Sequence, residues 1–148
     1  MALQTTYPDT QAPAVVGMQA TMIPATIISR NVEDAAGITF GKAVYQGATD
    51  KGITATSNAK FVGITLLDRS ATGVTGNADA FPQRASARVI TDGDVWVTAS
   101  VAVAAGDLVY LTSAGVFTNV ATNNTAITGA RWDTSTSAAG QLAVVRLG

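Results

Sequence analysis

The sequence predicts an all-β protein, a small barrel or sandwich preceded by an extended N-terminal arm. Residues 85–120 are rich in β-forming side chains: residues 95–100 would face alternate sides of a strand, and 108–111 form a further apolar run. Short turn-forming triplets separate these runs, because Gly permits positive φ and Asp bonds its own backbone. Residues 1–26 hold three of the four prolines and one charge, Asp9. Such a segment is predicted to be extended and not a strand within a sheet.

The chain of 148 residues is long enough to bury its own core as one domain. We divide it into an arm, residues 1–36, and a β domain, residues 37–148. No basic segment followed by an apolar core opens the sequence, and no run approaches the roughly 18 apolar residues of a membrane span. We therefore expect a protein made and assembled in the cytoplasm.

The arm carries large apolar side chains although it has almost no charge. A segment that stayed in solvent would usually be charged and lack such groups, so we expect a partner to cover it. An arm that folds back onto its own domain is the alternative. The candidate contact residues are Val15, Val16, Met18, Met22, Ile23, Ile27 and Ile28.

Within the β domain, the order of apolar runs and turn residues defines the expected elements. Strands are predicted at 42–46, 61–67, 127–132 and 141–147, with three more inside 85–120. Turns are predicted at 92–94 and 113–115, and loops at 47–58 and 68–82. Gly63 lies inside a predicted strand, which indicates a bulge or a close backbone approach.

A weak internal repeat suggests two similar units. Gly41–Tyr45 and Gly106–Tyr110 share the pattern G-x-x-V-Y. Gly63 follows the first pattern, and Gly129 follows the second at nearly the same distance. Two similar supersecondary units packed into one barrel or sandwich would give this arrangement.

The residue inventory excludes most catalytic chemistry. The chain has no Cys and no His, so disulfides, thiol nucleophiles and a Ser-His-Asp site are impossible. No phosphate-binding glycine motif occurs. Asp92 and Asp94 form a close carboxylate pair, for which a turn is favoured over calcium binding. Trp96 and Trp132 could form a sugar-binding platform, but core or subunit-contact aromatics are favoured.

The low charge content points to a covered surface. Only 13% of residues are charged and 47% are hydrophobic, with a net charge of −1. Free monomers generally need charge to stay soluble, so other subunits would cover much of this surface. A thermally robust β domain rich in Thr and Ala is the alternative. Neither nucleic acid nor a membrane surface is an expected partner.

Short apolar motifs follow one another along nearly the whole chain. They are Pro13–Met18, Ile27–Glu33, Ile38–Val44, Phe61–Ile64, Val95–Val97, Ala105–Tyr110 and Ala143–Leu147. In this order and spacing the chain resembles the structural cement proteins of tailed phages. The resemblance implies a capsid decoration protein outside the shell, with the major capsid protein as its partner. It also implies a compact β domain that forms trimers and an N-terminal arm that reaches over neighbouring capsid subunits.

We therefore predict a viral structural protein that binds the outside of a phage head and bridges major capsid subunits. It would be a homotrimer on the outer surface of the virion, with no enzymatic activity, cofactor or metal. Two alternatives stay open. One is a tail or fibre domain that binds host glycans through its aromatic residues, and the other is a cell-wall hydrolase that uses Asp92 or Asp94.

Overall fold

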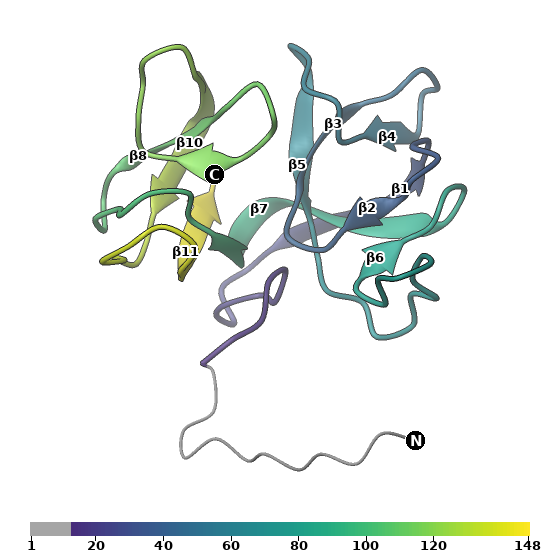
Figure 1. The fold of residues 1–148 in the computed structure, drawn as a ribbon, viewed down its shortest axis with the longest axis horizontal. Helices are drawn as coiled ribbons and strands as arrows, with labels where there is room; N and C mark the ends of the chain where they lie inside the picture. Colours follow the sequence, from purple (N-terminus) through teal and green to yellow (C-terminus); the bar gives the residue numbers. More distant parts are fainter. Residues whose placement is uncertain (1–12) are drawn as a thin grey trace.

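The protein, described here from a computed structural model over residues 13–148, is built from β-strands, which confirms the predicted class. Figure 1 shows two lobes joined by one long strand. The strands are β1 (Thr26–Val32), β2 (Ile38–Thr39), β3 (Ala43–Gln46), β4 (Gly52–Thr54), β5 (Phe61–Thr65), β6 (Ala80–Phe81), β7 (Ser86–Thr98), β8 (Leu108–Leu111), β9 (Phe117–Thr118), β10 (Thr125–Trp132) and β11 (Leu142–Leu147).

The first lobe is a closed five-stranded barrel in the order β1-β4-β3-β5-β7, which closes where β7 pairs with β1. β1 runs parallel to β4 and antiparallel to β7, so the barrel is mixed. Alternate side chains of these strands point inward, because successive residues of a strand face opposite sides. The inward side chains Val32, Val44, Ile53, Ala87 and Val89 form one buried cluster with Ile38, Phe40 and Phe81, which lie outside the five barrel strands.

A separate two-stranded sheet, β2 paired with β6, contributes to the core of this barrel. Phe81 of β6 meets Phe40 edge-to-face, with ring centroids 5.0 Å apart. Both rings are buried, and edge-to-face contact is a favoured geometry for aromatic pairs. β6 and the residue that follows β2 therefore supply two of the largest side chains of the first core.

The second lobe continues the same sheet through β7, β11, β10, β8 and β9. It also closes, because Ala99 beyond the end of β7 forms a parallel bridge with Phe117 of β9. The N–H of Ser100 donates to the carbonyl of Phe117 at 3.0 Å. The larger buried cluster fills this lobe and extends to the outer face of β3 and β5, so the lobes share packing.

The two lobes have equivalent strand orders, in agreement with the repeat in the sequence. In the first, β3 pairs with β4 and with β5; in the second, β8 pairs with β9 and with β10. The pattern G-x-x-V-Y lies on β3 and β8, and the later glycines lie on β5 and β10. Each unit also has one parallel contact. In the first unit β1 runs parallel to β4, and in the second Ala99 forms a parallel bridge with Phe117 of β9. The chain therefore contains two similar five-stranded units that share β7.

The prediction of a turn at Asp92–Asp94 is wrong, because these residues lie inside the 13-residue strand β7. The strand changes partners there and does not reverse. Before Gly93 it pairs with β1 and β5, and after Gly93 it pairs along β11. Gly93 has φ of 124°, which side chains rarely permit, and Ala25 presses against it. The triplet therefore carries one strand from the first lobe into the second.

The first barrel strand, β1, begins at Thr26, inside the range 1–36 assigned to the arm. Its main partner, β7, lies sixty residues further along the chain, so local sequence did not reveal the pairing. Residues 1–12 of the predicted arm lie outside the described residues. The part of the arm that can be followed before the barrel is residues 13–25.

Candidate functional site

Residues 14–21 lie along the second half of β7. The N–H of Gly17 donates to the carbonyl of Trp96, and the N–H of Trp96 donates to the carbonyl of Met18, both at 2.8 Å. Gln19 forms an antiparallel bridge with Val95. The carbonyl of Gly17 also accepts the N–H of Leu67 at 2.8 Å. Backbone hydrogen bonds therefore hold this segment, which we call the arm root, on its own domain.

A buried carboxylate fixes the end of the arm root. The side chain of Asp94 has no exposed surface. One of its oxygens accepts the N–H of Thr21 at 3.0 Å, and the other accepts the Thr21 hydroxyl at 2.5 Å. A buried polar group is costly unless it is hydrogen-bonded, and Thr21 provides both donors. Sequence reasoning could not find this contact, because the two residues are 73 positions apart.

The seven predicted contact residues differ in exposure. Met22 is fully exposed, Val15 is 44% exposed and Ile27 is 37% exposed. Val16, Met18, Ile23 and Ile28 are half-buried, and Ile28 packs against the core of the first barrel. The arm root is therefore folded back onto its own domain, which is the alternative considered for the arm. Three large apolar side chains still face outward from this segment and the start of β1.

A groove of 590 Å³ lies beside the start of the described chain. Val15 and Val16 line it together with Phe40 and Leu67, and Arg69 adds a cation. The groove therefore continues the apolar surface of Val15 onto both lobes.

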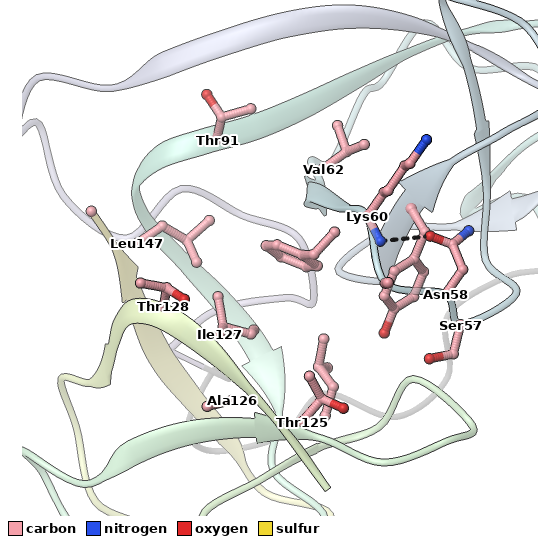
Figure 2. A pocket seen from close by; sticks show the side chains of 15 residues that line it. Ser57, Asn58, Lys60, Val62, Thr91, Thr125, Ala126, Ile127, Thr128 and Leu147 are labelled. Carbon is pink, nitrogen blue, oxygen red and sulfur yellow. Dashed lines mark hydrogen bonds between the residues drawn. The ribbon is translucent and has the colours of Figure 1, made fainter.

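A second hollow, a cleft of 430 Å³, lies between the lobes. In Figure 2, Ser57, Asn58, Lys60 and Val62 form one wall, and residues 125–128 with Leu147 form the opposite wall. The side-chain oxygen of Asn58 accepts the N–H of Lys60 at 2.8 Å and so shapes the first wall. The cleft holds one cation and no carboxylate side chain, so it offers no acid–base pair.

Catalytic and metal-binding arrangements are not found among residues 13–148. The structure there contains no cluster of three or more acidic residues that could hold a metal ion. Asp94 binds Thr21, whereas Asp92 is exposed. Trp132 is buried in the second core and is unavailable for a sugar platform with Trp96. No helix in this part of the chain could cross a membrane.

The second lobe has very few charges. Residues 95–148 include only four charged side chains, Asp107, Arg131, Asp133 and Arg146. Arg146 pairs with Asp133 at 3.1 Å. The side-chain amide of Asn119 donates to Asp107 at 2.7 Å, and this contact, with the N–H of Ala104, lowers the pKa of Asp107.

Exposed apolar side chains lie on the same lobe. Leu108 and Val120 are 42% and 45% exposed. Leu108 begins β8, and Val120 lies two residues beyond the end of β9, which pairs with β8 at Tyr110 and Leu111. Depletion of charge together with exposed apolar groups is typical of the centre of a subunit interface. We call this surface the β8–β9 face.

Comparisons with known proteins give a consistent assignment. A family model described as "Structural cement protein (E217 gp24/Pam3 gp6)" matches residues 3–148. The fold is similar to a chain from the capsid of Myoviridae Phage XM1, with a TM-score of 0.74 and 21% identity over 100% of this chain and 98% of that chain. The head fiber gp8.5 N base of bacteriophage phi29 gives a TM-score of 0.47 and 10% identity over 84% of this chain and 95% of that chain, and carries no weight here. No curated protein sequence matches.

The family match spans both lobes and the arm root, and its description names a structural protein. It confirms the resemblance stated from the sequence motifs, and it confirms that the chain is a structural component of the phage capsid and not an enzyme. The chain belongs to the phage structural cement protein family.

Proposed function

We propose that this cement protein binds the outside of the phage head and bridges neighbouring major capsid subunits through the arm and the start of β1. The single observation that supports this is the outward exposure of Val15, Met22 and Ile27 next to an arm root fixed by Asp94. An exposed apolar group on a rigid support can be buried without a large ordering cost. The other predicted contacts, Val16, Met18, Ile23 and Ile28, would support this surface from below.

Repetition makes such a contact effective. Burial of apolar surface contributes about 25 cal/mol per Å², so three side chains give a modest energy per copy. A protein that touches two subunits at once gains from effective concentration, and many copies act on one shell. The structure thus supports bridging through small contacts repeated over the head.

The test is binding of Val15→Asp and Met22→Asp variants to capsids assembled without the cement protein. Each variant introduces a charge that the interface would have to desolvate, so we expect at least about tenfold weaker binding. Ala139→Asp is the matched control, because it adds the same charge at an exposed turn between β10 and β11, outside the arm, β1 and the β8–β9 face. Co-sedimentation measures binding, and capsid melting measures stabilisation. Binding equal to wild type for both arm variants would contradict the proposal.

We also propose that the protein is a homotrimer that associates through the β8–β9 face. The support is the scarcity of charge on the second lobe and the exposure of Leu108 and Val120. Sedimentation equilibrium should give three times the chain mass of 15.0 kDa. Leu108→Asp together with Val120→Asp should give a folded monomer. A wild-type monomer, both free and in cryo-electron microscopy of decorated heads, would refute this assembly.

A further inference from the structure

Strand β1 has neighbours on both sides only at its C-terminal end. β7 pairs with it from Thr26 to Asn31, whereas β4 pairs only with Asn31 and Val32. β4 starts at Gly52, because residues 47–51 form the turn that leaves β3. On that side, residues 26–30 have no partner strand within the described chain, 13–148.

Hydrogen bonds at the end of β1 show which groups face this open side. The N–H of Asn31 donates to Lys51 at 2.8 Å, toward β4. The N–H of Val32 donates to Ala85 at 3.0 Å, on the opposite side. Successive residues of a strand direct their N–H and C=O groups to opposite neighbours. Odd-numbered residues of β1 therefore face the β4 side.

The N–H groups of Ile27 and Ser29 thus point to the open side, as does the carbonyl of Ile27. The carbonyl of Ser29 accepts the Arg30 guanidinium at 3.1 Å and is already used. Unpaired donors and acceptors along a strand form a template for another extended backbone. Residues 27–29 present such a template at the surface.

The surroundings of this edge fit an apolar, extended partner. Ile27 and Met22 are exposed, and the edge carries neither charge nor proline from Ile27 to Ser29. A bulge between Thr26 and Ile27 limits it at one end, and Arg30 limits it at the other. Exposed edges are normally protected by charge, proline or a covering element. Within the described part of the chain, Ile27, Ile28 and Ser29 have none of these protections on the side that faces away from β7.

We infer that this edge accepts an extended segment of a capsid subunit, which joins the first barrel as an added strand beside β1. The inference rests on the proposed function and names its mode of recognition. The edge is continuous with Met22 and Ile27, the exposed residues proposed to touch the capsid. The surface proposed for a second copy of this chain lies on the other lobe. Added-strand recognition takes its affinity from backbone hydrogen bonds, which these groups offer.

The test replaces Ser29 by Pro, which removes the outward N–H without removing a bond to β7. Proline is tolerated in edge strands where its nitrogen faces away from the sheet. Ser29→Ala is the matched control, because it keeps the N–H and loses only the hydroxyl contact with Ser86. We expect Ser29→Pro to keep the wild-type circular dichroism spectrum and to bind capsids about five- to tenfold more weakly. Ser29→Ala should bind as wild type does.

Amide hydrogen exchange gives a second readout that does not depend on a variant. The amides of Ile27 and Ser29 should exchange quickly in the free protein and slowly on capsids, while those of Ile28 and Arg30 are slow in both. Unchanged exchange of Ile27 and Ser29 on capsids would overturn the inference. So would protection that rises with protein concentration when no capsid is present, because a second copy would then be the occupant.

The two proposals fail in different ways. If Val15→Asp and Met22→Asp weaken binding but Ser29→Pro does not, only the added strand is wrong. If the wild-type protein does not bind capsids at all, the proposed function itself is wrong.

Discussion

Asp94 and Thr21 form a clasp between the centre of the long strand and the last residue of the arm root. Both oxygens of the buried carboxylate accept hydrogen bonds from Thr21, one from its N–H and one from its hydroxyl. The clasp lies just beyond Gly93, where β7 passes from one lobe to the other. The position of Met22, the next residue, therefore depends on a buried acidic side chain in the interior of the domain.

Removal of the hydroxyl should loosen this clasp. Thr21→Val leaves one oxygen of a buried carboxylate without its donor, which should lower the free energy of unfolding by about 1–3 kcal/mol. Urea denaturation measures this loss. Thr98→Val is the control, because Thr98 is an exposed threonine at the end of β7, the strand that carries Asp94. This variant should change the free energy of unfolding by less than about 0.5 kcal/mol. Equal effects of the two variants would show that the hydroxyl is not important.

Gly63 should not tolerate a side chain. A Cβ at this position would lie against the carbonyl of Ile90 and 2.8 Å from a methyl of Val89, both on β7. Gly63→Ala should therefore destabilise the protein by about 1–3 kcal/mol through crowding. Gly76→Ala separates crowding from backbone strain, because it has open space but φ of 82°. That variant should lose about 1–2 kcal/mol from the left-handed backbone alone, with no change in the packing of β5 on β7 seen by NMR.

The single glutamate should make stability depend on pH. The hydroxyl of Thr49 and the N–H groups of Ala48 and Thr49 bind Glu33, and these contacts hold the pKa of Glu33 below its ordinary value of 4.5. A lowered folded-state pKa stabilises the protein above the unfolded value, and this contribution is lost as pH falls through the folded value. Glu33→Gln should thus be less stable than wild type at pH 7, and the difference should shrink below pH 4.5. Thermal melting from pH 7 to pH 3 measures it; a constant difference would contradict the prediction.

Phe81 should be essential to the first barrel. Its ring is buried against Phe40, so Phe81→Ala should cost about 3–5 kcal/mol through lost contact and a cavity. Met22→Ala should leave the free energy of unfolding within about 0.5 kcal/mol, because Met22 is fully exposed. The same variant should weaken capsid binding if the proposed function holds. Chemical denaturation and co-sedimentation together separate the two roles.

The sequence revealed features that depend on local pattern. Alternation identified the strand around Val95–Val97, a continuous apolar run identified Leu108–Leu111, and the paired glycines identified the repeat on β3 and β8. The close approach at Gly63 followed from a glycine inside an apolar strand, and the structure confirms it. In each of these cases, the physical cause lies within a few residues of the signal.

Features that depend on distant partners could not be predicted. Asp92–Asp94 has the composition of a turn, but β11 and the arm root pair with β7 beyond it and keep it extended. β1 follows Pro24 and was assigned to the arm, because the strand that pairs with it, β7, does not begin until Ser86. Capsid contact by the seven apolar residues stays a prediction, because their exposure alone does not identify what covers them.

The common strand β7 has a mechanical consequence. The part of this strand before Gly93 pairs with β1 and β5, and the part after it pairs along β11, so one continuous backbone strand, and not a loop, joins the two lobes. Tension that enters through the arm root would reach this strand next to Asp94, where Thr21 is bound. We therefore expect pulling on the arm to load both lobes together and to unfold them in one cooperative step.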